Sequence, residues 1–255
     1  MSAAKPTLFH IPFSPWSLKA RFVLAHHGVE VDARGYAPVL DELGMRVRLR
    51  KPRGRITVPM LFTPDGVLTD SWQIANYAER VGSGAPLIPP ALHDAVADWN
   101  SASERLLSAG RARAMVRAIG DVEAIIETLP ERVRKHPLVA SPMGRVGLQL
   151  FNRKYGIRRA DVLLHESTMR LELDHLRKAL ADGRRYLLGG FSYADVTMAL
   201  ALQVLEPLPE SPLGPASRSV ATDSVLKASY GDLLRWRNDI NAVHPLVTRS
   251  AARAA

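Results

Sequence analysis

Two serines near the amino terminus lie where a predicted strand gives way to a predicted helix. The motif Ser14-Pro15-Trp16-Ser17 follows a strand at residues 7–11 and opens a helix over about 16–27. Serine followed by proline is a typical helix start, with Ser14 as the N-cap and Pro15 at the first helical position. A helix start also presents free N–H groups and the positive end of the helix dipole. A bound thiolate or other anion is stabilised there, and a serine hydroxyl can donate one more hydrogen bond to it. The capping interpretation therefore leaves room for an anion site.

A proline before a predicted hairpin marks a second candidate position. Residues 58–62 and 66–68 flank Pro64-Asp65-Gly66, which is a β-hairpin signature. Proline at a strand start cannot donate to the ladder, so Pro59 marks an edge strand, a first strand position or a cis bond. In the cis case, the peptide groups of Val58 are exposed for pairing with an extended ligand. The motif alone favours neither this interpretation nor an ordinary edge proline.

Asp70 and Ser71 form a third candidate at the next helix start. The helix that they open has an apolar face at residues 74, 77 and 81. As a cap the pair needs no ligand, and this is the commoner reason for Asp-Ser before an apolar run. As a site, Asp70 would hold a ligand ammonium, while the Ser71 hydroxyl and the helix N–H groups would hold a ligand carboxylate.

The elements that position these motifs change in kind along the chain. Up to about residue 81, short apolar runs alternate with helical patterns in the order β-α-β-α-β-β-α, with the second strand at 29–36 and the second helix at 40–51. After a Gly/Pro-rich break at 82–90, periodicity predicts helices at 91–109, 111–119, 121–135, 159–182, 193–206 and 225–241. Segments 136–158 and 207–223 are interrupted by Pro, Gly and Ser and are predicted to be irregular. We therefore predict an α/β domain at 1–83 and an all-α domain at 91–255.

Composition excludes several classes of protein. Of 255 residues, 47% are apolar and 23% are charged, which excludes a disordered chain. There is no cysteine, which excludes disulfides, thiolate-ligated metal sites and a nucleophilic thiol of the protein's own. No signal peptide or membrane span is visible, and His-Glu-x-x-His, Walker A and Gly-x-Gly-x-x-Gly motifs are absent. We predict a cytoplasmic protein with no membrane partner, no metal and no bound nucleotide.

Taken together, the three motifs resemble the cytosolic glutathione transferase (glutathione S-transferase) family. The resemblance lies in their order: a strand, Ser-Pro-x-Ser and a helix, then Val-Pro before a hairpin, then Asp-Ser before a helix, then an all-helical half. It covers the first 82 residues well. Residues 14–17 occupy the place of the Cys-Pro-x-Cys motif of glutaredoxins, with serine in place of both cysteines. The stretch at 14–24 is most similar to the serine-type classes, such as tau and zeta.

A second resemblance lies in the helical half. Residues 191–195 resemble a capping box of the same family. In such a box Ser192 and Asp195 cap one helix reciprocally, and Phe191 packs onto Val196. We assign this element a structural role and no catalytic one.

The resemblance implies roles for the first two motifs. Ser14 would donate a hydrogen bond to the sulfur of glutathione and favour its thiolate. Ser17 is the alternative sulfur ligand. Val58 would pair its backbone with the cysteinyl unit, beside a cis peptide bond at Pro59.

The resemblance also implies how the two ends of glutathione and the second substrate would be held. Asp70 and Ser71 would bind the amino and carboxylate groups of the γ-glutamyl unit. A basic residue before the third strand would bind the glycyl carboxylate, and Arg55 and Lys51 are both candidates. The pocket for the electrophile would lie between the two domains. Its expected lining comprises Ile11, Pro12, Trp16 and residues 99–113.

One segment of the first domain is strongly basic. Six arginine and lysine residues lie within ten positions without an acidic residue among them. A basic surface of this kind can bind nucleic acid or acidic lipid, but no recognition motif or interleaved aromatic residue accompanies it. A solvated basic face that also attracts an anionic tripeptide is the favoured interpretation, and nucleic acid is the less favoured partner. The six residues are Arg46, Arg48, Arg50, Lys51, Arg53 and Arg55.

The resemblance implies a thioredoxin-like amino-terminal domain followed by an all-helical carboxyl-terminal domain. We therefore expect a glutathione transferase, homodimeric by family resemblance and of the kind used in detoxification. It would present the thiolate of glutathione to a small, largely apolar electrophile in the adjoining cleft. Glutathione is the co-substrate, and Ser14 stabilises the thiolate without being the nucleophile itself. Two alternatives stay open. One is a non-catalytic, glutathione-transferase-like module for protein interaction, and the other is a different glutathione-dependent reaction, such as peroxide reduction, isomerisation or dehalogenation.

Overall fold

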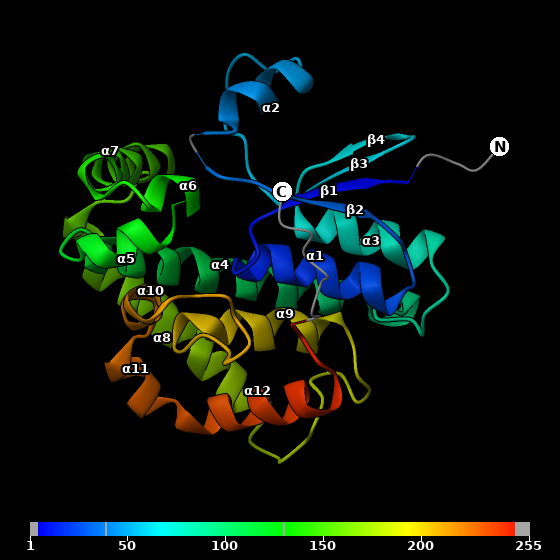
Figure 1. Ribbon diagram of the computed structural model, residues 1–255. Coiled ribbons are helices and arrows are strands. Elements are labelled where there is room, and N and C mark those ends of the chain that lie inside the picture. Colours follow the sequence, from blue (N-terminus) through cyan, green and yellow to red (C-terminus); the bar gives the residue numbers. More distant parts are fainter. Residues whose placement is uncertain (1–4, 39, 130, 248–255) are drawn as a thin grey trace.

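The amino-terminal part of the molecule is a four-stranded sheet with helices on both faces. The computed structural model describes residues 5–38, 40–129 and 131–247, without the side chains of residues 132 and 137–139. The strand order is β2-β1-β3-β4, with β2 parallel to β1 and the other neighbouring pairs antiparallel. This arrangement confirms the predicted thioredoxin-like α/β region (Figure 1). Its elements follow the predicted order and are β1 Thr7–His10, α1 Pro15–His26, β2 Asp32–Gly35, α2 Glu42–Arg48, β3 Met60–Thr63, β4 Gly66–Leu68 and α3 Ser71–Val81.

The two faces of the sheet are covered differently because side chains alternate along β1. Leu8 points into a core that it shares with α1 and α3. Phe9 packs on the opposite face, in a smaller cluster that contains Met45 of α2. Figure 1 shows α1 and α3 against one side of the sheet, while α2 stands apart on the other side.

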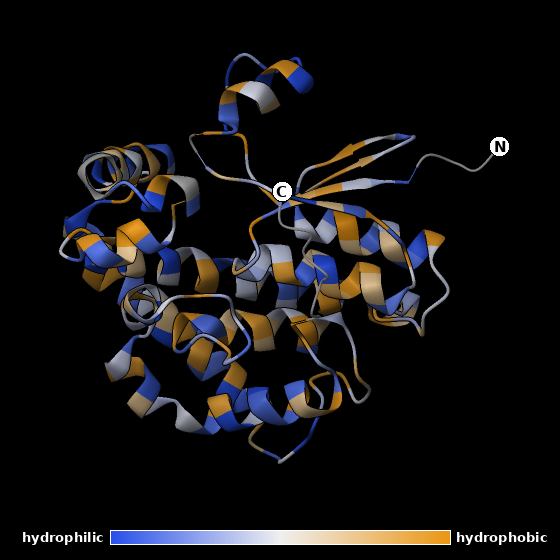
Figure 2. Ribbon diagram, viewed as in Figure 1, coloured by the Kyte–Doolittle hydropathy of each residue, from blue (hydrophilic) through white to orange (hydrophobic). Residues whose placement is uncertain are grey.

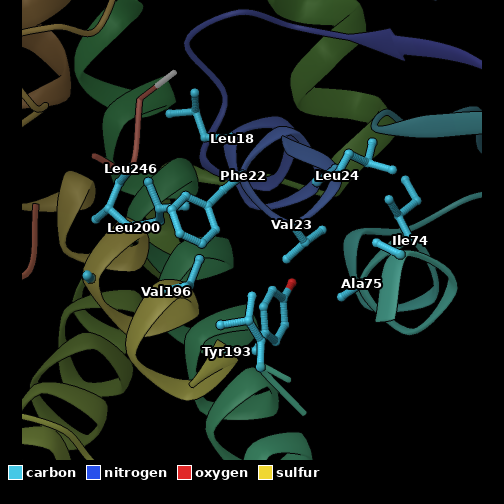
Figure 3. Packing of buried hydrophobic residues seen from close by; sticks show 14 of the residues in the cluster. Leu18, Phe22, Val23, Leu24, Ile74, Ala75, Tyr193, Val196, Leu200 and Leu246 are labelled. Atoms are coloured by element: carbon cyan, nitrogen blue, oxygen red, sulfur yellow. The ribbon is translucent and has the colours of Figure 1, made fainter. Parts of the chain in front are cut away.

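The core under the sheet continues into the helical region. Phe22 and Val23 of α1 lie beside Tyr193 and Val196 of α9 (Tyr193–Ala201), and all four side chains are buried (Figure 3). Every residue of α9 is buried, and apolar residues run along this helix (Figure 2). The α/β region and the helical region therefore share one packed interior in which α9 is the central helix.

The remainder of the described chain confirms the predicted all-helical half. None of its described helices is both long and apolar enough to cross a membrane. The elements besides α9 are η1 Pro90–Leu92, α4 His93–Ala118, α5 Val122–Glu127, α6 Glu131–Arg134, α7 Pro137–Tyr155, η2 Arg159–Asp161, α8 Val162–Ala179, η3 Leu202–Val204, α10 Pro215–Ala221, α11 Ser224–Ser229 and α12 Gly231–Val243.

The predicted break between helices 91–109 and 111–119 is wrong. The chain forms one continuous helix there, α4, and Gly110 lies inside it. Gly110 is buried, and a Cβ at this position would collide with Val204 of η3. The glycine therefore serves close packing between two helices, and it does not end the first of them.

The prediction that segments 136–158 and 207–223 are irregular is wrong for most of the first segment and for residues 215–221 of the second. Each contains a helix, α7 and α10, and each of these helices begins with proline at its first turn. α7 ends at Gly156, which adopts the left-handed conformation at φ 65°. Pro137, Gly156 and Pro215 lie at the ends of these helices, whereas Pro142, Gly144 and Gly147 lie inside α7. Two predicted helices are in turn split: 121–135 into α5 and α6, with its residue 130 outside the described residues, and 225–241 into α11 and α12.

Candidate functional site

Three of the sequence motifs meet at one edge of the sheet. Phe9 of β1 pairs with Met60 of β3, and Leu61 of β3 pairs with Leu68 of β4. Because both ladders are antiparallel, the carboxyl ends of β1 and β4 lie beside the amino end of β3. Continuing the register by two residues places Ile11 opposite Val58. It also places Asp70 opposite Pro59. The turns that carry Ser14, Val58 and Asp70 are therefore neighbours in space, although they are far apart in the sequence.

The hydroxyl of Ser14 is not used by the protein's own helix. Ser14 is the N-cap of α1, with extended backbone (φ −72°, ψ 125°), and its carbonyl oxygen accepts a hydrogen bond from Leu18 N at 2.9 Å. Its side chain makes no capping hydrogen bond and is half-buried. The N–H groups of Trp16 and Ser17, in the first turn, have no partner within an α-helix. The start of α1 thus presents one hydroxyl and two backbone donors at the edge of the sheet.

Ser17 lies one turn further along and is placed quite differently. Its side chain is fully buried, and its Oγ accepts a hydrogen bond from Ile11 N at 3.1 Å. This bond closes the loop between β1 and α1. The structure therefore gives Ser17 a structural contact and leaves Ser14 as the more accessible of the two sulfur-ligand candidates.

The peptide bond between Val58 and Pro59 is cis. This confirms the cis interpretation over that of an ordinary edge proline. Within the described part of the chain, the backbone N–H and carbonyl of Val58 make no hydrogen bond. The side chain of Val58 packs with Ile11 against the cluster on the α2 face, which fixes the position of this free peptide group.

Asp70 and Ser71 form the start of α3, where Asp70 is exposed and Ser71 is buried. Asp70 is the N-cap, and its Oδ1 accepts a hydrogen bond from Gln73 N at 2.8 Å. The side chain of Asp70 is exposed, and its second carboxylate oxygen makes no hydrogen bond with a described residue. Ser71 is buried, and its carbonyl oxygen lies 3.5 Å from the Tyr193 hydroxyl that donates to it. The cap interpretation is therefore correct for Asp70, and it leaves one carboxylate oxygen available to a ligand.

The two candidates for the glycyl carboxylate lie on the exposed loop that leads into β3. Lys51 and Arg55 are both exposed, and the Arg55 guanidinium lies 5.9 Å from the centre of the Tyr155 ring. Two other members of the basic segment have structural contacts that the sequence did not indicate. Arg46 donates to the carbonyl oxygen of Gly54 at 2.9 Å, and the Arg48 guanidinium lies over Phe62 at 4.3 Å. Only part of the basic segment is thus a freely solvated face.

A buried polar network behind the α1 start was not predicted. Lys19 is completely buried, and its Nζ lies 2.7 Å from Ser103 Oγ and 2.9 Å from Glu104 Oε1 on α4. The other oxygen of Glu104 accepts a hydrogen bond from Trp16 Nε1 at 2.5 Å. Burial lowers the pKa of Lys19, while Glu104 acts in the opposite direction. The Glu104 carboxylate thus contacts both the buried Lys19 and the indole of Trp16, which follows Ser14 in the turn between β1 and α1. The sequence gave no signal that singled out Lys19, because Arg21 carries the same charge two residues further along α1.

The ring of Trp16 also contacts a cation from the helical region. The Arg111 guanidinium of α4 lies 4.8 Å from the Trp16 ring centre and 4.0 Å from that of Tyr155 at the end of α7. This contact brings Trp16 next to the helix range 99–113, as expected. Members of that range line a nearby cavity, whereas Ile11, Pro12 and Trp16 are not among its lining residues. Trp99, at the other end of the expected range, is instead a core residue stacked on His175.

A cavity of about 300 Å³ lies next to this cation, between α4, α8 and the α7–η2 connection. Arg111, Tyr155, Ile157 and His165 are among the residues that line it. A second hollow, of about 380 Å³, lies at the junction of α3 and α4 and contains none of the predicted site residues. No group of three or more metal-binding side chains is found among the described residues.

Comparison with known proteins agrees with this arrangement. Residues 13–81 match the model of the glutathione S-transferase N-terminal domain family. No curated protein sequence matches the chain. Among solved structures, a glutathione S-transferase from Methylobacillus flagellatus KT with glutathione bound is 21% identical, covers 92% of this chain and 94% of its own, and has a TM-score of 0.59.

Two further solved structures share the fold over nearly the whole chain. A glutathione transferase family member from Pseudomonas fluorescens Pf-5, with bound glutathione, is 20% identical, covers 95% of this chain and 96% of its own, and has a TM-score of 0.62. The beta-etherase LigF from Sphingobium sp. strain SYK-6 is 19% identical, with 95% and 97% coverage and a TM-score of 0.60. At these identities the structures establish the shared fold of both regions. The three site motifs lie within or next to the matched amino-terminal segment.

Proposed function

We propose that this protein is a glutathione transferase that binds glutathione at the edge of the sheet and activates its thiol beside Ser14. The observation that carries the proposal is the start of α1. An N-cap hydroxyl there is unused by the helix, next to an unpaired peptide group at Val58 and a second helix start at Asp70. Such a set of donors and acceptors suits an extended peptide with a thiol at its centre. The match of residues 13–81 to the N-terminal domain family supports the same proposal.

The chemistry of the proposed site follows from the charge that develops on sulfur. A thiolate at the start of α1 would accept the hydrogen bond of the Ser14 hydroxyl and lie at the positive end of the helix dipole. Both interactions favour the anion over the neutral thiol, so they lower the pKa of the thiol. Ser14 itself stays protonated and forms no covalent bond. The sulfur of glutathione would then attack an electrophilic carbon held on the α4 side of the site.

Other residues would orient the peptide. Val58 would pair with the cysteinyl unit through its N–H and carbonyl groups. The free oxygen of Asp70 would accept from the γ-glutamyl ammonium, and the N-terminal N–H groups of α3 at Ser71 would hold its carboxylate. Lys51 or Arg55 would hold the glycyl carboxylate. The α/β domain at 1–83, the helical domain at 91–255, a homodimeric assembly and a cytoplasmic location belong to the same proposal, because the family resemblance implies them.

The first experiment is isothermal titration of the purified protein with reduced glutathione. We expect saturable binding in the micromolar-to-millimolar range. The pKa of the bound thiol is then followed by the ultraviolet absorbance of the thiolate, and it should fall below the free thiol value of about 8.5. A protein that binds no glutathione at any temperature tried would exclude the proposal.

The second experiment separates Ser14 from Ser17. Ser14→Ala removes the hydrogen bond from the serine hydroxyl to the charged thiolate. We expect this loss to lower kcat/KM for a chloronitrobenzene electrophile by about tenfold to a hundredfold. The thiol pKa should rise with it, while the Kd of glutathione changes little. Ser17→Ala should leave the thiol pKa of the bound peptide close to the wild-type value. The reverse result, a raised thiol pKa in Ser17→Ala alone, would assign the sulfur to Ser17.

A further inference from the structure

Arg111 carries a positive charge that the described part of the protein does not neutralise. It forms no ion pair and no hydrogen bond with a described residue, and its Nε is enclosed without a partner. Glu104, whose carboxylate acts on Arg111 electrostatically, is already shared by Lys19 and Trp16. Burial lowers the pKa of the Arg111 guanidinium, Tyr155 and Glu104 act in the opposite direction, and Arg55 adds to the lowering. A cation in this position is costly for folding unless a ligand completes its surroundings.

Two aromatic rings contact the guanidinium of Arg111. The Tyr155 ring centre lies 4.0 Å away and the Trp16 ring centre 4.8 Å away, so both rings contact the guanidinium through cation–π interactions. These contacts hold the group in place and leave its hydrogen-bond donors unused. The guanidinium is thus held ready for an acceptor, with little freedom left to lose on binding.

The cavity beside Arg111 suits a small organic anion. No acidic residue lines it, and the second arginine on its wall, Arg105, already forms an ion pair with Glu172. Ala109, Ala112 and Ile157 give the cavity an apolar wall, and Ser108, Thr168 and His165 add polar groups. One uncompensated positive charge, apolar walls and a volume of about 300 Å³ match a molecule that has a carboxylate on a compact apolar body.

We propose that this cavity is a binding site for a small organic carboxylate, with Arg111 as its counter-charge. The site adjoins Trp16, which belongs to the turn that begins with Ser14. If the proposed glutathione transferase activity holds, the carboxylate belongs to the electrophile, and the protein prefers acidic acceptors over neutral ones of the same shape. That second statement rests on the proposed function, whereas the binding site itself does not.

The site is tested first without glutathione. Sodium benzoate is titrated into the full-length protein, and binding is followed by calorimetry and by quenching of tryptophan fluorescence. We expect saturable binding that Arg111→Met weakens by about tenfold or more, because a hydrogen-bonded charge pair is lost. Arg153→Met, which removes an equal charge from an exposed position on the same stretch of α7 that ends at Tyr155, should bind benzoate as the wild type does.

Several outcomes of this titration would overturn the proposal. Benzoate that fails to bind the wild type, or that binds Arg111→Met equally well, removes the carboxylate site. Benzyl alcohol that binds as tightly as benzoate shows an apolar pocket in which charge has no role. Inorganic phosphate that competes as well as benzoate shows an anion site without preference for an organic acid. A large rise in the Kd of glutathione in Arg111→Met, with benzoate binding unchanged, would assign Arg111 to the peptide.

Thermal unfolding distinguishes a binding role of Arg111 from a structural one. The two roles predict opposite shifts of the unfolding temperature in Arg111→Met. Because Arg111 is enclosed without an ion partner, Arg111→Met should unfold at the wild-type temperature or above it. A clear fall in the unfolding temperature would show that the guanidinium serves the fold, and it would contradict the binding role.

Conjugation then tests the substrate preference separately. The electrophiles are 4-(chloromethyl)benzoate and 4-nitrobenzyl chloride, which share the reacting carbon and differ in charge. The wild type should favour the benzoate in kcat/KM, and Arg111→Met should lose that preference by about tenfold while it keeps its rate with the neutral compound. Benzoate binding without any conjugation would sink the proposed function and leave the site intact. Conjugation without a preference for the acid would support the proposed function and would remove the statement that the protein prefers acidic electrophiles.

Discussion

The starts of α1 and α9 carry nearly the same sequence signal, and the protein uses them differently. Each has a serine N-cap and a polar residue three positions later, Ser17 after Ser14 and Asp195 after Ser192. In α9 the two side chains form a complete, buried capping box. In α1 the serine hydroxyl at the N-cap makes no capping bond. We call α9 a closed start, because the protein's own side chains form its capping hydrogen bonds. We call α1 an open start, because its N-cap hydroxyl has no capping partner and can bind a ligand.

The third residue of each helix explains how an open start remains stable. Asp195 accepts hydrogen bonds from Ser192 N at 2.9 Å and Leu187 N at 2.8 Å, which tie the incoming chain to α9. Ser17 turns back in the same manner and accepts from Ile11 N at 3.1 Å. The residue at the third helical position therefore anchors the loop in both cases. Only in α9 is the N-cap hydroxyl also committed, since Ser192 Oγ donates to Asp195 Oδ2.

The largest effect on stability is expected at the closed start. Asp195→Ala removes the acceptor of two buried backbone N–H groups and of the Ser192 hydroxyl, so we expect the free energy of unfolding to fall by about 2–4 kcal/mol. Burial raises the pKa of the Asp195 carboxyl against the opposing effect of these hydrogen bonds, so loss of the buried charge offsets part of the cost. Urea unfolding followed by circular dichroism gives the number. Asp195→Asn is the control, since it keeps one acceptor oxygen and should lose less.

An intermediate effect is expected at Ser17. Ser17→Ala leaves the N–H of Ile11 without its acceptor at a buried position, which should cost about 1–2 kcal/mol of unfolding free energy. Ser101→Ala, on an exposed position of α4, measures the cost of losing a serine hydroxyl alone. Equal stabilities for the two variants would mean that the bond from Ile11 contributes nothing to the closed loop.

The sequence predicted the α/β region well because its signals there are local. Pro64-Asp65-Gly66 defined the hairpin, and Pro15 and Asp70 sat at the true helix starts. The helical region was predicted less well for two reasons. Gly110 packs against Val204, a contact that the sequence does not show, so it resembled a helix end. Pro142, Gly144 and Gly147 resembled loop residues, although α7 continues through them.

The candidate site shows the same difference between residues with local sequence signals and residues whose roles depend on the fold. Ser14, Val58 and Asp70 were found because a strand edge and two helix starts have sequence signatures. Arg111 and Glu104 were missed as individual site residues because their roles depend on a helix that crosses behind the turn. Nothing in the order of residues along α4 distinguishes a cation that faces Trp16 from one that faces solvent. The part of the site that would select an electrophile is therefore the part that only the fold displays.

The smallest effect on stability is expected at Ser14, and it is the sharpest test of the open start. An N-cap serine that bonds its helix contributes about 1 kcal/mol, but Ser14 makes no such bond, so Ser14→Ala should change the unfolding free energy by less than about 0.5 kcal/mol. Saturating glutathione should stabilise the wild type and the variant alike, because stabilisation follows from the Kd and the variant binds the neutral peptide nearly as well. The difference in unfolding free energy between the wild type and the variant should then widen as pH rises through the pKa of the bound thiol. The wild type has both the Ser14 hydrogen bond and the helix dipole to stabilise the thiolate, whereas the variant has the dipole alone. A stability loss near the full cap value at every pH would show that Ser14 is a closed start after all, of the same kind as Ser192.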